Sequence, residues 1–192
     1  MQIDWDALWK ELIGQFSLGA DSIHGPEHWR RVERHAVELA EHNGGDLLVV
    51  RLFAVFHDVC RVNDGRDDEH GARGAEQALR LRGRCFELTD DKFAQLHYAC
   101  CWHTAGQLSD DPTIGACWDA DRLDIWRAGY IPHERFMSTD HARSLVRAGC
   151  IGPEYTPLGG VIDVVPDMDI SEMEGIFPEL SLTDIRDETD RL

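Results

Sequence analysis

The chain contains, at residues 47–60, the stretch LLVVRLFAVFHDVC, which is apolar almost throughout until it reaches His57 and Asp58. A run of this length with apolar residues on nearly every side is typical of a helix buried at the centre of a domain. Asp46, directly before the run, suits the N-cap of that helix. A histidine and an aspartate that close a buried helix are costly unless they are paired or bind a metal ion. The stretch therefore predicts a central helix and, at its end, a candidate metal site.

Helical spacing of apolar residues continues on both sides of this stretch. Glycine-containing stops such as Asn43-Gly44-Gly45 separate the helical runs, and strand-like sequence is concentrated in residues 159–165. We therefore predict an all-α bundle of about six to seven helices. The expected helices cover residues 4–16, 26–43, 46–60, 70–82, 89–104 and 112–125, with a shorter one at 138–148.

Composition and charge narrow the classes of function. The 192 residues are 43% hydrophobic and 29% charged, which is typical of a globular protein. The net charge is −17, from 36 acidic and 19 basic residues, so phosphate backbones repel the chain and no polynucleotide partner is expected. No apolar stretch is long enough to span a membrane, and the N-terminus does not resemble a secretory signal. Six cysteines without a CxxC pair favour free thiols and a cytoplasmic location.

The negative charge is concentrated near the C-terminus. Residues 151–192 contain eleven acids and two arginines, a net charge of −9, which is over half of the total. We therefore divide the chain into a domain at residues 1–150 and an acidic C-terminal extension at residues 151–192. The strand-like segment at residues 159–165 is a candidate for pairing across a homodimer.

Three segments place metal-type ligands on helix faces that otherwise point into a core. His28 heads the apolar stripe of its helix, His57-Asp58 closes the central helix, and Asp121 lies in the last core helix. Each residue alone has an ordinary explanation, such as a hydrogen-bonded core histidine or an acid on a solvated face. One divalent cation would satisfy all of them together.

The order His28…His57-Asp58…Asp121 resembles the signature of the HD-domain superfamily of metal-dependent phosphohydrolases. The similarity covers roughly residues 15–150. The resemblance implies an all-helical domain in which these four residues bind one metal ion in a cleft between helices. Histidine and aspartate ligands suit Mn, Fe, Co, Ni or Zn, so we expect one or two divalent transition-metal ions as cofactor.

The same resemblance distinguishes among the acids of the segment DADRLD. It favours Asp121 over Asp119 as the ligand, because the ligand of the family stands directly before Arg-Leu. Asp119 and Asp124 remain candidates for contacts to the ligands.

Two further histidines raise the question of a second ion. His70 and His103 occupy the intervals in which dinuclear members of the family carry extra histidine ligands, and Asp58 would then bridge the two ions. The alternative role for His70 is to cap a surface helix. His97 lies on a different helix face from His103, and we prefer His103 as the ligand.

The chemistry implied by such a site is hydrolysis by a metal-activated water. We expect Asp58, His57 and Arg61 to take part in catalysis. The arginines near the ligands suit a phosphate group, and they equally suit pairing with the acids at residues 64–69. The candidates for substrate binding are Arg61, Arg66, Arg73 and His24.

The sequence therefore predicts a phosphohydrolase that cleaves a phosphoester or phosphoanhydride bond of a small phosphorylated molecule, with a nucleotide as the expected substrate. Two other functions remain open. One is a non-catalytic HD domain that binds a nucleotide or a protein and regulates. The other is a di-iron oxygenase, since a few proteins that resemble this motif hold two irons and cleave carbon bonds with O₂.

Overall fold

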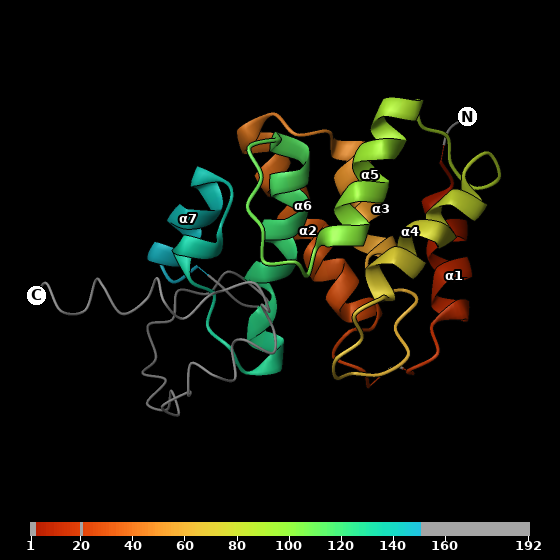
Figure 1. Cartoon of the computed structure of the whole chain (residues 1–192), viewed down its shortest axis with the longest axis horizontal. Helices are drawn as coiled ribbons and strands as arrows, with labels where there is room; N and C mark the ends of the chain where they lie inside the picture. The colour runs from red at the N-terminus through yellow and green to blue at the C-terminus, as the bar shows by residue number, and fades with distance from the viewer. Residues whose placement is uncertain (1–2, 20, 151–192) are drawn as a thin grey trace, which may run out of the picture.

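The computed structural model describes residues 3–19 and 21–150. The acidic extension, its strand-like segment at 159–165 and the homodimer contact expected there lie outside the described residues. The described residues form α-helices and two short 3₁₀ helices, with no strand beyond one isolated bridge between Arg82 and Phe86, so the all-α prediction is confirmed (Figure 1). The elements are α1 (Trp5–Gln15), α2 (Pro26–Asn43), α3 (Leu47–Phe56), α4 (His70–Leu81), α5 (Asp90–Trp102), α6 (Pro112–Leu123), η1 (Ile125–Ala128), η2 (Glu134–Phe136) and α7 (Asp140–Arg147).

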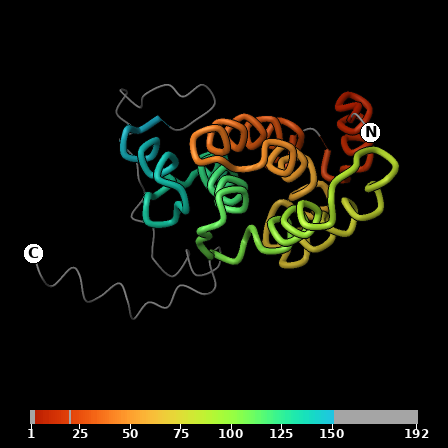
Figure 2. The backbone as a smooth tube through the Cα atoms, turned by 90° about the horizontal axis from the view of Figure 1, so that it is seen from above, coloured from red at the N-terminus to blue at the C-terminus, as the bar shows by residue number. Residues whose placement is uncertain are grey.

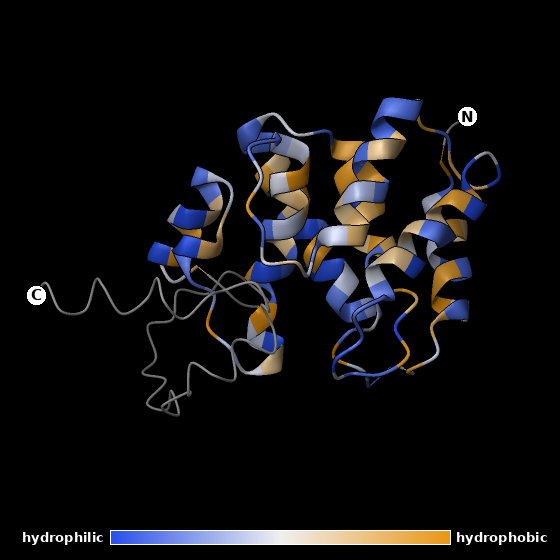
Figure 3. Ribbon diagram, in the orientation of Figure 1, coloured by the Kyte–Doolittle hydropathy of each residue, from blue (hydrophilic) through white to orange (hydrophobic). Residues whose placement is uncertain are grey.

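The helix α3 forms the centre of the fold, as its apolar sequence predicts. Every residue from Leu52 to Phe56 is buried, and α3 contacts α1, α2, α4, α5 and α6. Its N-cap is Asp46, whose carboxylate accepts hydrogen bonds from the backbone N–H groups of Leu48 and Val49. Figure 2 shows how the backbone of the neighbouring helices is arranged around α3, and Figure 3 shows that these helices carry both hydrophobic and hydrophilic residues along their length. The functional residues at the end of α3 are therefore held by a rigid, fully packed element.

Three helices end about two to four residues earlier than the sequence predicts. The helix α3 ends at Phe56 instead of residue 60, α5 ends at Trp102 instead of 104, and α6 ends at Leu123 instead of 125. After α3, the Arg61 N–H bonds to the Asp58 carbonyl, which closes a turn of three residues instead of continuing the helix. The motif residues of these segments consequently lie at helix ends, where backbone carbonyls have no partner within the helix.

The helix α4 packs unusually close to its neighbours because of two glycines. A Cβ atom at Gly71 would lie 2.2 Å from the carbonyl oxygen of Cys100 in α5. A Cβ atom at Gly74 would lie 2.1 Å from the carbonyl oxygen of Phe56 in α3. Both distances are far below van der Waals contact, so any side chain there would push the helices apart. The two glycines thereby hold the first residue of α4, His70, next to the ends of α3 and α5.

The helix α7 packs against α2 and α6 at one end of the molecule (Figure 1). It is anchored by the buried carboxylate of Asp119, which accepts hydrogen bonds from the N–H groups of Ser138 and Thr139, each at 2.7 Å. The Thr139 side chain then caps α7 at Ala142. Among the described residues, no helix combines the length and apolar character needed to cross a membrane.

Candidate metal centre

Seven buried or nearly buried side chains from six segments converge next to the end of α3. Two lie in the turn after α3, one precedes α2 and one lies in its first turn. The others stand at the start of α4, just after α5, and near the end of α6. They are His24, His28, His57, Asp58, His70, His103 and Asp121. The structure therefore brings together all six residues that the sequence predicts as metal ligands, together with His24.

The direction of each lone pair follows from what lies behind the imidazole ring. His57 Nδ1 faces the Ala54 carbonyl at 3.0 Å, and His28 Nδ1 faces the Asp124 carboxylate at 2.7 Å. Both partners are acceptors, so in the neutral rings Nδ1 carries the proton and Nε2 carries the lone pair. The two Nε2 atoms nevertheless lie only 3.0 Å apart. Two bare lone pairs at that separation repel each other unless a cation lies between them.

The same arrangement recurs at the next pair of histidines. His103 Nδ1 faces the Cys100 carbonyl at 2.8 Å, and His70 Nδ1 faces the Asp67 carbonyl in a short hydrogen bond. Their Nε2 atoms are 2.9 Å apart and are both turned toward Asp58. In two cases, His57 and His103, the acceptor is a carbonyl left without a helical partner by the helix end. The early ends of α3 and α5 therefore select the tautomer that ligates a metal through Nε2.

Asp58 connects the two groups of donors through its two oxygens. Its Oδ2 atom lies 3.6 Å from His28 Nε2 and 3.7 Å from His57 Nε2. Its Oδ1 atom lies 3.1 Å from His70 Nε2 and 3.6 Å from His103 Nε2. One carboxylate oxygen is thus available to each pair of imidazoles, which is the geometry of a bridging carboxylate.

Asp121 completes the first group. Its Oδ1 atom lies 3.2 Å from His28 Nε2 and 3.8 Å from His57 Nε2. We define the first half-site as His28, His57, Asp58 Oδ2 and Asp121. The second half-site consists of Asp58 Oδ1, His70 and His103. Each half-site contains three donor residues whose ligand atoms lie within 4.8 Å of one another.

The protonation states favour cation binding. Burial lowers the pKa of His57 to about 3 and also lowers the pKa of His70. Burial by itself would raise the pKa of Asp58, but the neighbouring imidazoles hold it well below its usual range. Burial likewise opposes ionisation of Asp121, and contacts with His28 and Arg127 hold its pKa well below the usual range. Imidazole Nε2 atoms and ionised carboxylate oxygens that converge in this way fit one or two divalent metal ions.

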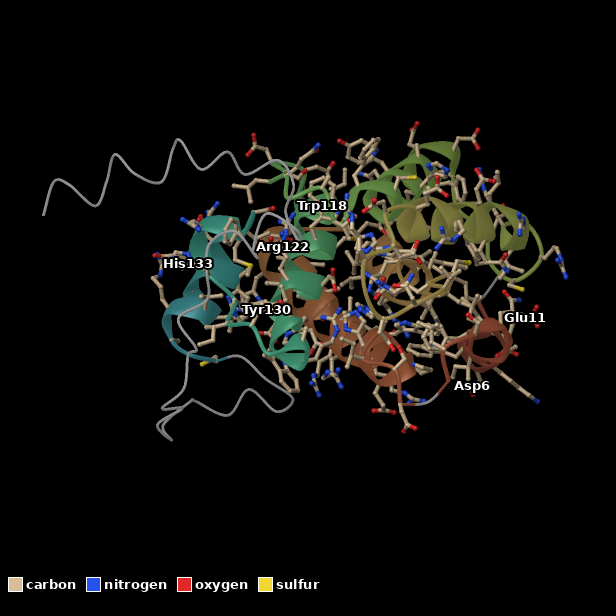
Figure 4. The ribbon with its side chains drawn as sticks, turned by 60° about the horizontal axis from the view of Figure 1, so that its bottom comes forward. Asp6, Glu11, Trp118, Arg122, Tyr130 and His133 are labelled. Carbon is tan, nitrogen blue, oxygen red and sulfur yellow. The ribbon has the colours of Figure 1, made fainter. Side chains whose placement is uncertain are left out.

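Asp124 and Asp119, the two candidates for contacts to the ligands, have different roles. Asp124 accepts a hydrogen bond from His28 Nδ1 and another from Arg31 Nε, both at 2.7 Å, and is fully buried. It therefore orients a metal ligand through the far side of the ring. Asp119 instead anchors the start of α7. Arg122, labelled on α6 in Figure 4, donates to the carbonyls of Gln107 and Phe136 and so holds the chain around α6.

The candidates for substrate binding divide into two sets. Arg61 lies at the cluster, with its Nε 3.0 Å from Asp58 Oδ1 and its Nη1 bonded to the Gly65 carbonyl. His24 also lies there, with Nδ1 2.8 Å from Asp58 Oδ2. Both are nine-tenths buried beside the shared carboxylate. The structure thus places these two residues where they can act on a bound substrate.

The structure does not bring Arg66 or Arg73 into the cluster. Arg66 is exposed and pairs with the exposed Asp68. Arg73 donates two hydrogen bonds to Asp67 and a third to the Cys60 carbonyl. The acids of the loop between α3 and α4 engage both arginines, so neither guanidinium is directed at the cluster. Both arginines therefore pair with neighbouring acids, which is the alternative to phosphate binding that the sequence left open.

One residue at the cluster is missed by the sequence analysis. Arg127 lies in η1, after the end of the predicted helix, and its Nη2 is 3.5 Å from Asp121 Oδ1. The only signal for it in the sequence is a basic residue six positions after a predicted ligand, which is not specific. His97, the alternative to His103, lies near Glu76 and Cys101 and is partly exposed. A surface groove of about 810 Å³ between α4 and α5 is lined by His97 and by none of the cluster residues.

Comparisons with known proteins agree with this geometry. A family model described as HD domain matches residues 26–130, which is more than half of the chain. The crystal structure of a predicted HD superfamily hydrolase from an uncultured Thermotogales bacterium is similar, with a TM-score of 0.58 and 25% sequence identity. The similarity covers 74% of this chain and 83% of that one. A search of curated proteins found no match. The chain therefore belongs to the HD-domain family of metal-dependent phosphohydrolases.

Proposed function

We propose that this protein hydrolyses a phosphoester or phosphoanhydride bond of a small phosphorylated molecule, with a nucleotide as the expected substrate class. The observation that carries the proposal is the set of four imidazole Nε2 atoms that converge on the two oxygens of Asp58, each ring with an acceptor behind it at Nδ1. Divalent ions held by this set would supply a water of lowered pKa and would withdraw charge from a phosphoryl oxygen.

The surrounding residues keep the donor set fixed. Asp124 orients His28, and backbone carbonyls at the ends of α3 and α5 orient His57 and His103. Arg61 is anchored by the Gly65 carbonyl and holds Asp58 through Oδ1. A hydrolytic site needs its ligands placed before substrate arrives, because reorganisation during the reaction raises the barrier.

The expected substrate class follows from the net charge of the chain and from the basic groups at the cluster. With a net charge of −17 the chain repels a polynucleotide. The basic groups at the cluster, His24, Arg61 and Arg127, suit a single phosphate group or a short phosphate chain. The complete donor set argues against a purely regulatory domain, which would need neither half-site.

The first test is elemental analysis of the full chain, purified without a His-tag or chelator. We expect one to two equivalents of a transition metal and hydrolysis of p-nitrophenyl phosphate or nucleotides with that ion. In Asp58→Ala both half-sites lose a ligand, so bound metal should be lost and turnover should fall by about 100-fold or more. Circular dichroism should remain helical, since the variant leaves the apolar core untouched.

A matched control is Asp68→Ala, which removes an exposed carboxylate of the neighbouring loop. It should keep the metal content and turnover of the wild type. Full turnover in Asp58→Ala, or no uptake of metal on titration, would contradict the proposal. Two bound irons together with O₂ consumption would favour the oxygenase function, for which the histidine-rich second half-site is also suited.

A further inference from the structure

Solvent reaches the cluster on the side of Asp121. The side chains of the other five donors are 3% exposed or less. Asp121 is 16% exposed, and its neighbours His24 and Arg127 are 10% and 9% exposed. These three side chains are therefore the ones through which the first half-site reaches solvent.

Arg127 is held in place at two of its three nitrogens. Its Nε donates to the Ile23 carbonyl and its Nη1 donates to the Asp124 carbonyl, each at 3.0 Å. These bonds tie η1 to the loop that precedes α2. Since both acceptors are backbone groups, the orientation of the guanidinium is fixed, and the third nitrogen, Nη2, points at the cluster.

The contacts of Nη2 are longer than those of Nε and Nη1, the other two nitrogens of the Arg127 guanidinium group. It lies 3.5 Å from Asp121 Oδ1, whereas charge-assisted bonds between guanidinium and carboxylate are usually about 2.7–2.9 Å long. It also lies 3.5 Å from His24 Nδ1. Because His24 Nδ1 lies 2.8 Å from Asp58 Oδ2, it is a donor as well. His24 is therefore engaged by Asp58, whereas Arg127 Nη2 has no acceptor closer than Asp121 Oδ1 at 3.5 Å among the described residues.

Charge makes this arrangement specific for an anion. When Asp121 and Asp58 hold divalent ions, their negative charge is no longer available to Arg127. The Asp124 carboxylate stays 3.9 Å from Nη1, but it is shared with His28 and Arg31, so Nη2 faces a centre of positive charge and an anion between them would be favourable. A phosphoryl group placed there would accept from Nη2 and would contact the ion on its other side.

We propose that Arg127 is a substrate-binding residue, whose Nη2 donates a hydrogen bond to a non-bridging oxygen of the phosphoryl group held at the first half-site. This inference rests on the proposed function. It assigns different roles to the two arginines of the cluster. Arg127 binds substrate, whereas Arg61, which bonds Asp58 directly, positions the shared carboxylate.

The test uses the full chain loaded with its metal and inorganic phosphate as the probe. Isothermal titration gives the Kd for phosphate, and steady-state kinetics give KM and kcat for p-nitrophenyl phosphate. In Arg127→Gln the Kd should rise by about 10-fold or more, as expected for losing a hydrogen bond to a charged group. KM should rise in proportion, bound metal should stay at the wild-type level, and Arg127→Lys should recover part of the phosphate affinity.

The control is Arg80→Gln, which removes the same charge from an exposed position on α4 and should leave the Kd for phosphate unchanged. A purely structural role of Arg127 would lower Tm and metal content while leaving the Kd of the metal-loaded fraction unchanged, and that result would overturn the inference. If the metal-loaded wild type neither bound phosphate nor hydrolysed any ester, the proposed function itself would be contradicted.

Discussion

The lone pairs at the cluster are directed by acceptors that lie behind the rings. Three of the four imidazoles use backbone carbonyls for this purpose, namely those of Ala54, Asp67 and Cys100. Only His28 uses a side chain, Asp124. A backbone carbonyl cannot be removed by substitution, so Asp124 is the one place where the orientation of a histidine at the cluster can be tested directly.

We expect Asp124→Ala to weaken metal affinity by about 10- to 100-fold, because His28 then loses the partner that fixes its tautomer and ring orientation. Competition with a chromogenic chelator would measure the affinity. The control comes from the same helix region. Asp119→Ala leaves the N–H groups of Ser138 and Thr139 without their acceptor, so it should lower Tm but retain metal affinity. Equal metal affinity in wild type and Asp124→Ala would contradict the role of Asp124.

The sequence predicts the residues of the donor set better than the residues around it. His28, His57, Asp58 and Asp121 follow a motif with a fixed order, and each lies on an otherwise apolar face, which gives two signals for the same residue. Arg127 follows no pattern. It reaches the cluster because η1 turns the chain back toward the loop before α2, and that turn depends on tertiary contacts such as the bond to the Ile23 carbonyl.

At the scale of the elements, the second half-site depends on how closely α4 approaches α3 and α5. His70 is the first residue of α4, and Gly71 and Gly74 follow it on the face that contacts the two other helices. The sequence predicts a helix over residues 70–82 in which Gly71 and Gly74, three residues apart, favour close packing, but it does not give the distance between helices. That distance is set by backbone contacts that involve no side chain.

We expect Gly74→Ala to destabilise the protein by about 1–3 kcal/mol or more, because its Cβ would overlap the Phe56 carbonyl oxygen, which is backbone and cannot rotate away. Urea unfolding monitored by circular dichroism would measure the change. Gly14→Ala is the control, since nothing lies within 4 Å of a Cβ there in the exposed face of α1. That variant should be neutral or gain up to about 1 kcal/mol from helix propensity. Similar stability in both variants would contradict the close packing of α4.

At the scale of the whole molecule, buried histidines make folding sensitive to acid. His35 lies in the core of α2, and burial lowers its pKa to about 4, against an opposing contribution from Asp124. The unfolded chain, with a histidine pKa near 6.5, binds more protons than the folded protein between these two values. Stability should therefore be full above pH 6.5 and should fall as the pH approaches 4.

We expect His35 to account for about 3 kcal/mol of that loss, from the difference between the two pKa values. The measurement is the free energy of unfolding of chelator-treated protein between pH 7 and pH 4, compared with His35→Gln. Other buried histidines such as His57 contribute equally to both curves, so the difference between the curves isolates His35. Parallel curves for wild type and variant would contradict the prediction.

The fold as a whole could be predicted from apolar spacing, since the expected helices match α1 to α7 within about four residues at each end. The largest mismatch is at the end of α3, where the apolar pattern continues to Cys60 but the helix stops at Phe56. The spacing of apolar residues indicates which face of a helix is buried. That spacing does not indicate that the helix ends at Phe56. Because the chain leaves the helix there, Asp58 lies close to ligand residues from the segments of α2, α4, α5 and α6.

The spread of the donor residues along the chain has a consequence for biosynthesis. The second half-site is complete once His103 has left the ribosome, whereas the first half-site also needs Asp121 from α6. The donors of the second half-site are therefore all synthesised before α6, which then supplies Asp121 and completes the first half-site. A metal ion bound by the earlier set would restrict the ends of α3, α4 and α5 before α6 packs against them, so metal binding and the last step of folding would be coupled.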